Sequence, residues 1–170
     1  MDKVRLGVIG VGNMGTGHCE NYLSGKEPEI EITAVADRRQ SRRDWARAHL
    51  PETVEIFEEG ADLIASDACD AVLIAVPHYQ HPPLAIDAFA HGKHVLCEKP
   101  AGVYTLQVRQ MNEAAARSGR VFAMMFNQRT NCVYRKMHEL VQGGALGRLK
   151  RVSWLITDWF RTRYYYESGA

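Results

Sequence analysis

The sequence predicts an α/β fold: a doubly wound parallel sheet, followed by the beginning of a second, α+β domain whose open sheet is mostly missing. Two observations support the sheet. Short apolar segments rich in β-branched residues alternate with helical segments at short spacing. One segment, the run AVLIAV over 71–76, is apolar throughout, as expected of a strand covered by helices on both faces. We place the domain boundary between residues 1–126 and 127–170.

The first half of the chain predicts three strands and three helices, bounded by turn signals. Gly25 and Pro28 end the first helix, and Pro51 ends the arginine-rich second helix. The strands are expected at Val4–Ile9, Ile30–Ala36 and Val54–Phe57, and the helices at Asn13–Leu23, Gln40–Leu50 and Gly60–Ala65.

The next stretch predicts three more strands and two more helices. Prolines open the first of these helices, where proline is tolerated, and Ser118-Gly119 ends the second. The strands are expected at Ala71–Val76, His94–Cys97 and Val121–Phe126, and the helices at Pro82–Phe89 and Leu106–Ala116. Right-handed crossovers between parallel strands then place helices on both faces of the sheet.

Residues 127–170 follow a different pattern. Val133–Gln142 is typical of a helix, and Arg148–Phe160 alternates like a strand. The apolar side chains of its alternating face are Val152, Trp154 and Ile156. A lone strand with this aromatic surface is not stable by itself. More sheet must come from residues absent from this sequence or from another chain, so we expect only the connecting helix and first strand of a second domain.

Composition excludes several classes of protein. The 170 residues are 46% hydrophobic and 24% charged, with a net charge of +1, which argues against global disorder and against a strongly basic nucleic-acid binder. No apolar run approaches the roughly 20 residues that span a bilayer, and no signal peptide is evident. The four scattered cysteines form no C-x-x-C pair. We expect a reduced, cytoplasmic protein with no nucleic-acid partner, no membrane partner and no metal.

A glycine-rich turn follows the first predicted strand and opens the first predicted helix. Gly10-Val11-Gly12-Asn13-Met14-Gly15 matches the pattern G-x-G-x-x-G. In such a turn the first glycine permits the sharp bend, the second lets the backbone approach a pyrophosphate, and the third lets the helix pack closely on the strand. The pyrophosphate meets free N–H groups at the positive end of the helix dipole. This context predicts a Rossmann-type dinucleotide site.

The second predicted strand ends in Asp37, which lies 22 residues after Gly15. A carboxylate at this place accepts hydrogen bonds from the ribose hydroxyls and repels a 2′-phosphate, which favours NAD. Arg38 and Arg39 follow directly, and a guanidinium can bind that phosphate, so NADP stays possible. Most arginines of the following helix are expected to be solvated, with Arg38 as the exception that contacts the cofactor.

The fifth predicted strand leads into Cys97-Glu98-Lys99-Pro100. Together with GVIGVGNMG at 7–15, the run AVLIAVPHYQHPPLAIDAFAHGKHVLCEKPAG at 71–102 and FNQR at 126–129, this segment resembles the Gfo/Idh/MocA family of NAD(P)-dependent oxidoreductases. The resemblance covers the chain almost end to end. It implies hydride transfer between nicotinamide and a secondary alcohol or ketone of a sugar, inositol or related polyol. It also implies a homo-oligomer, a dimer or tetramer, when the protein is full length.

The resemblance assigns roles to single residues. Lys99 matches the lysine of the family's Glu-Lys-Pro motif, which reaches the active site, and the Lys99–Pro100 bond is a candidate cis peptide. The residues expected to border the cofactor are Val76, Pro77, His78, His81, Glu98, Lys99 and Asn127, although His78 stands where many relatives have asparagine. Apart from Val76, which ends its strand, these positions lie just past predicted strands, whose carboxyl ends line the ligand crevice. Lys99 could polarise a substrate hydroxyl and share proton transfer.

The remaining assignments concern the substrate and the alternatives. Asp158, Trp159 and Arg161 match a region that approaches the substrate, though Trp159 could equally be a core residue of the missing sheet. Asp87 and His91 have the spacing of the family's D-x-x-x-H pair but lie on a first-domain helix, so no catalytic histidine is assigned. The alternative function is a non-catalytic dinucleotide-binding sensor or interaction module. We expect the 170-residue chain alone to bind dinucleotide without turning over a polyol.

Overall fold

The computed structural model describes residues 3–157 and 160–167. The chain divides into two compact units, Met1–Met125 and Phe126–Ala170. Each unit is described by itself.

Unit one contains a six-stranded sheet in which every pairing is parallel. The strands are β1 (Val4–Ile9), β2 (Ile30–Ala36), β3 (Glu55–Phe57), β4 (Ala71–Ile74), β5 (His94–Glu98) and β6 (Phe122–Met125). The helices between them are α1 (Asn13–Leu23), α2 (Gln40–His49), α3 (Gly60–Ala65), α4 (His81–Ala90) and α5 (Thr105–Ser118). A 3₁₀ turn, η1 (His78–Gln80), precedes α4. The predicted doubly wound α/β fold is confirmed.

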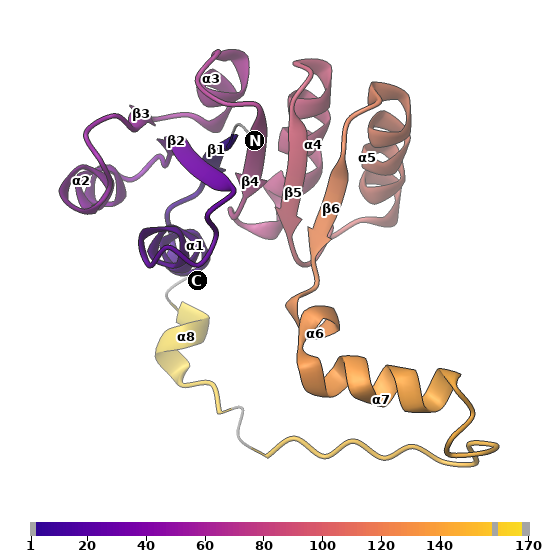
Figure 1. Ribbon diagram of the computed structural model, residues 1–170. Helices are drawn as coiled ribbons and strands as arrows, with labels where there is room; N and C mark the ends of the chain where they lie inside the picture. Colours follow the sequence, from indigo (N-terminus) through magenta and orange to yellow (C-terminus); the bar gives the residue numbers. More distant parts are fainter. Residues whose placement is uncertain (1–2, 158–159, 168–170) are drawn as a thin grey trace. The chain divides into compact units, whose positions relative to one another are not determined.

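The strand order is β3-β2-β1-β4-β5-β6, so the chain winds outward from β1 in both directions (Figure 1). The first three strands follow one another to one edge. The chain then crosses over to place β4 on the other side of β1, as the pairing of Leu6 with Ala71 records. This reversal beside β1 is the topological switch point of the fold. In open α/β sheets, ligands bind outside the carboxyl ends of the strands at such a point.

The sheet separates two apolar cores. On one face, Leu63 of α3, Ala88 of α4 and Met111 of α5 pack against the strands. On the other face, the core includes Cys19 of α1 and Ala46 of α2. Figure 1 shows α4 and α5 along the β4–β6 side of the sheet. Burial on both faces explains why the β4 segment is apolar throughout rather than alternating.

An irregularity in the pairing of β1 with β2 changes which way β2 side chains face. Leu6 pairs with Ile32, but the next residue, Gly7, pairs with Ala34, so Thr33 is an extra residue in β2. Ile32 and Ala34 would share a face in a regular strand, yet they belong to opposite cores. The hydroxyl of Thr33 is buried without a hydrogen-bond partner in the described part of the chain. The bulge therefore determines which face of the sheet the side chains of the last β2 residues point to.

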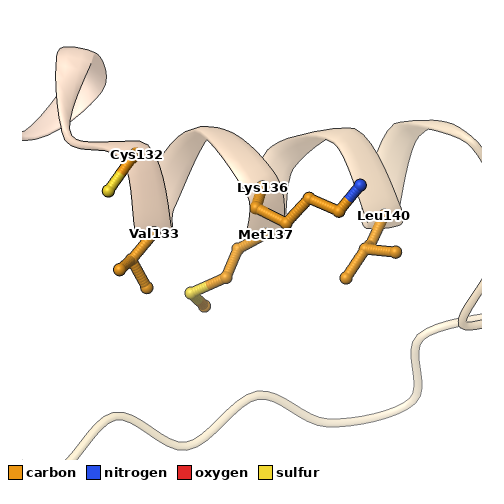
Figure 2. A pocket seen from close by; sticks show the side chains of 5 residues that line it. All are labelled: Cys132, Val133, Lys136, Met137 and Leu140. Atoms are coloured by element: carbon orange, nitrogen blue, oxygen red, sulfur yellow. The ribbon is translucent and has the colours of Figure 1, made fainter.

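Unit two contains α6 (Asn127–Thr130), α7 (Cys132–Gln142) and α8 (Arg163–Glu167). The side chain of Asn131 caps α7 by accepting a hydrogen bond from the Val133 N–H. Figure 2 shows Val133, Met137 and Leu140 along one side of α7, and these side chains are exposed. Their spacing of three and four residues makes an apolar stripe on the helix.

The predicted strand at Arg148–Phe160 is wrong for the residues that the structure describes there. Residues 149–157 have neither helix nor strand, and 163–167 form the short helix α8, which the sequence reasoning missed together with α6 and η1. A strand needs a neighbour for its backbone hydrogen bonds, and unit two provides none in its described residues. The apolar side chains of this segment, such as Leu155 and Ile156, are exposed.

Candidate functional site

The turn between β1 and α1 depends on two of its three glycines for its own folding. Gly10 has φ +91°, and a Cβ there would lie 2.7 Å from the Ala75 carbonyl oxygen. A Cβ at Gly15 would lie 1.8 Å from the carbonyl oxygen of Gly10. Both glycines are therefore required by close contacts within the protein itself.

Gly12 differs, because no close contact within the protein requires a glycine there. Its φ of −78° suits any residue, and a Cβ would meet only a terminal nitrogen of Arg39, at 3.5 Å. The helix that begins beside it, α1, has no side-chain cap and no acidic residue in its first turn, and the Met14 side chain is half exposed. The first N–H groups of the helix and its positive dipole end are thus open to an anion, and space is kept clear over Gly12.

Asp37 follows the end of β2 and is fixed by the glycine turn. One carboxylate oxygen accepts the Val11 N–H at 2.9 Å, and the other accepts the Arg39 N–H at 2.9 Å. The side chain is only 9% exposed. Each oxygen keeps lone pairs beyond these bonds, so the carboxylate can still accept from a further donor.

The two arginines after Asp37 point to different partners. Arg38 donates to Glu59 at 2.8 Å. Arg39 lies 3.7 Å from the Asp37 carboxylate, and its guanidinium is the group nearest to the space over Gly12. The sequence named both arginines and favoured Arg38, because adjacency to Asp37 does not reveal which side chain turns toward the glycine turn; the assignment of Arg38 to the cofactor stays a prediction.

The loop after β4 is joined to the Glu-Lys-Pro segment by a buried histidine. His81 is fully buried at the start of α4. Its Nδ1 lies 2.7 Å from the Pro100 carbonyl oxygen and its Nε2 lies 2.8 Å from the Val76 carbonyl oxygen. The His78 ring meets the His81 ring edge to face, with centroids 5.8 Å apart. The His81 ring thus lies between the segments that follow two neighbouring strands.

The Glu-Lys-Pro segment begins on the last residue of β5. Glu98 is buried, and its carboxylate lies 2.8 Å from Nε2 of His18 on α1. Its other oxygen accepts the Lys99 backbone N–H at 3.2 Å. The Lys99–Pro100 peptide is cis. The Lys99 side chain is exposed, and within residues 3–157 and 160–167 its amine has no hydrogen bond or ion pair, so it is available to an external group.

The structure gathers most, but not all, of the predicted site residues at one end of the sheet. One end of the sheet, at the carboxyl ends of its parallel strands, carries the glycine turn, Asp37, Val76–His81 and Glu98–Pro100. Asn127 is the first residue of α6 in unit two, and Arg161 also belongs to that unit. Asp158 and Trp159 lie outside the described residues. The placement of these four residues at the site stays a prediction, as do the roles of all the predicted site residues.

One predicted pair of unit one lies away from this end. Asp87 of α4 and His91, the residue that caps the end of that helix, form an exposed pair at 3.2 Å. Among the described residues, no cluster of three or more histidine, cysteine, aspartate or glutamate side chains could hold a metal ion. None of the helices in the described part of the chain is long and apolar enough to cross a membrane.

The chain is similar in sequence and in fold to known proteins. A family model described as "Oxidoreductase family, NAD-binding Rossmann fold" matches residues 4–126. Inositol 2-dehydrogenase of Rubrobacter xylanophilus is 37% identical over 147 residues, which are 86% of this chain and 42% of that protein. Myo-inositol 2-dehydrogenase of Thermotoga maritima is 31% identical over 145 residues, 85% and 42% of the two chains.

A solved structure is also similar: scyllo-inositol dehydrogenase from Lactobacillus casei with bound cofactor NAD(H) and scyllo-inositol. It is 28% identical, with a TM-score of 0.80, over 86% of this chain and 43% of that one. The chain thus spans less than half the length of the relatives that it matches.

Proposed function

Because the chain belongs to the Gfo/Idh/MocA family of oxidoreductases, whose model is an NAD-binding Rossmann fold, we propose that it is the coenzyme-binding part of an NAD(P)-dependent dehydrogenase. The reaction is hydride transfer between nicotinamide and a secondary alcohol or ketone of a sugar, inositol or related polyol. One observation carries the proposal: the first turn of α1 is uncapped, and Gly12 keeps space clear above it.

The residues of the turn fit a dinucleotide. The N–H groups of Asn13, Met14 and Gly15 at the start of α1 bind the pyrophosphate, and Gly12 allows its close approach. The Asp37 carboxylate, already held by two backbone N–H groups, accepts hydrogen bonds from the ribose hydroxyls. This carboxylate favours NAD over NADP, since a 2′-phosphate would meet a negative charge there. Arg39 lies where it can contact the adenosine end, and Arg38 stays with Glu59.

The nicotinamide end lies at the loops after β4 and β5. When bound, the nicotinamide supplies the hydride donor or acceptor. Val76, Pro77 and His78 border it, and Glu98 and His81 fix the segment that presents Lys99. The exposed Lys99 amine forms a hydrogen bond with the substrate oxygen: as the free base it accepts the hydroxyl proton when the alcohol is oxidised, and as the ammonium it returns that proton when the ketone is reduced.

Substrate class and assembly are proposed for the whole protein. The relatives named inositol 2-dehydrogenase and myo-inositol 2-dehydrogenase support a polyol substrate. Asn127 is assigned to the nicotinamide end, and Asp158, Trp159 and Arg161 to the substrate. The exposed apolar stripe on α7 supports further assembly of unit two, and we propose a homo-oligomeric, dimeric or tetrameric, cytoplasmic enzyme. The reduced state expected in the cytoplasm agrees with the four free cysteines.

Titration of the 170-residue chain with NADH, followed by nicotinamide fluorescence, tests the proposal. Saturable binding that is weaker for NADPH supports it, and absence of saturable binding contradicts it. Polyol-dependent NAD reduction by a full-length form distinguishes a dehydrogenase from a non-catalytic sensor. A screen of inositols and aldoses that gives no turnover, despite tight NADH binding, would favour the sensor.

A further inference from the structure

Glu98 is the most deeply buried acidic side chain beside the Lys99 segment, with 6% of the side chain exposed. A buried carboxylate is costly unless donors surround it. The structure gives it two: Nε2 of His18 at 2.8 Å and the backbone N–H of Lys99 at 3.2 Å. The first donor, His18 of α1, lies 80 residues from Glu98 in the sequence. The second donor is the backbone N–H of Lys99.

This arrangement links Lys99 to the helix that begins at the glycine turn. His18 lies five residues after Asn13, the first residue of α1. At a rise of about 1.5 Å per residue, His18 lies about 7.5 Å along α1 from the end that faces the proposed pyrophosphate. On the other side of Lys99, the Pro100 carbonyl is held by His81. Each neighbour of Lys99 therefore contacts a histidine: Glu98 contacts His18 of α1, and Pro100 contacts His81 of α4.

We propose that His18 is a positioning residue for Lys99. It acts through the carboxylate of Glu98, whose second oxygen holds the Lys99 N–H and so fixes the direction in which the lysine leaves β5. The inference rests on the proposed function, because it assigns a purpose to the position of Lys99. A displacement of about 1 Å at a reacting group can cost about 100-fold in rate, so a shift of the lysine segment after loss of the His18 donor would lower the rate of the proposed reaction.

The test compares two substitutions of His18 in the 170-residue chain. His18→Leu removes the donor at similar volume. His18→Gln keeps an amide N–H near the place of Nε2. His91→Leu is the matched control, since His91 also bonds a carboxylate, that of Asp87, but on an exposed helix face. If the leucine variant does not fold, His18→Asn replaces it, because its amide reaches only as far as Nδ1.

The readout is hydrogen exchange of the Lys99 backbone N–H, measured by NMR. Loss of a hydrogen bond to a charged group corresponds to roughly a 10- to 100-fold change in an equilibrium, so we expect exchange to quicken by that factor in His18→Leu. In His18→Gln and His91→Leu it should stay within about threefold of wild type. Rescue by glutamine separates positioning through a donor from simple packing of the imidazole ring.

The inference is overturned if the Lys99 N–H exchanges equally fast with leucine and histidine at position 18, or if glutamine behaves like leucine. NADH binding by the wild-type chain and by His91→Leu is measured in parallel. Failure of that binding would contradict the proposed function, whereas the exchange rates would still decide whether His18 holds the lysine segment. The two failures are therefore distinguishable.

Discussion

Substitution of Gly12 by alanine separates a glycine needed by a ligand from a glycine needed by the fold. The added Cβ would meet only the Arg39 guanidinium at 3.5 Å, an ordinary contact with the end of a flexible, exposed side chain. The backbone at Gly12 has φ −78° and ψ −160°, which alanine adopts without strain. Gly12→Ala should therefore leave the folded state intact.

The expected magnitudes follow from these contacts. Replacing glycine by alanine where the backbone permits it stabilises a protein by about 0.4–1 kcal/mol, because the unfolded chain loses freedom. If a pyrophosphate lies over Gly12, the methyl group collides with it. We expect NADH affinity to fall at least tenfold, which corresponds to about 1.4 kcal/mol. Thermal unfolding and NADH fluorescence titration of the same preparation measure the two effects.

Two other glycines provide controls. A Cβ at Gly17, also on α1, would have no contact within 4 Å outside its own helix, so Gly17→Ala should leave NADH affinity unchanged. Gly15→Ala places the Cβ 1.8 Å from the Gly10 oxygen, and we expect destabilisation of about 3 kcal/mol or more. Equal NADH affinity in wild type and Gly12→Ala would refute the reasoning, as would unfolding of Gly12→Ala with no ligand present.

Three further predictions concern other groups. Asp37→Ala should weaken NADH more than NADPH, because the ribose acceptor is lost together with the charge that repels a 2′-phosphate; parallel titrations check this, and an unchanged ratio contradicts it. Lys99→Ala in a full-length enzyme should lower kcat by about 100-fold or more at nearly unchanged NAD affinity, measured by steady-state kinetics. Turnover equal to that of the wild type would show that Lys99 takes no part in catalysis. Burial raises the pKa of the Cys19 and Cys97 thiols from 9.0 to about 12. As the pH rises, these thiols therefore ionise in the unfolded chain before they ionise in the folded one. The free energy of unfolding should be unaffected by these thiols below pH 9 and should fall between about pH 9 and 12, by up to about 1.4 kcal/mol per pH unit for each thiol. Cys19→Ala should reduce this slope of unfolding free energy against pH, as measured by urea unfolding, and an unchanged slope would contradict the assignment.

The sheet and the glycine turn were predictable because their signals are local. The run over 71–76 gives β4, and the spacing of Gly10, Gly12 and Gly15 gives the turn. The distance in sequence to Asp37 was enough to place it at the end of β2. Each of these inferences uses a period within one element or a fixed spacing between consecutive elements.

Other features depend on tertiary contacts that leave no local signal. Because Thr33 is an extra residue in β2, the side chains on either side of it point to opposite faces of the sheet, although the sequence pattern is that of a regular strand. The bond between His18 and Glu98 joins residues 80 positions apart. The tail segment has the alternation of a strand but has no partner strand in the described chain, so its pattern alone could not decide its structure.

The central claim is that the first turn of α1 binds the pyrophosphate of a dinucleotide, and amide NMR of the 170-residue chain during NADH titration tests it most directly. We expect saturable shifts concentrated at the N–H groups of Val11, Asn13, Met14 and Gly15, with the same midpoint as the fluorescence titration. Shifts that never saturate, or that saturate only at residues away from this turn and from Asp37, would contradict the claim.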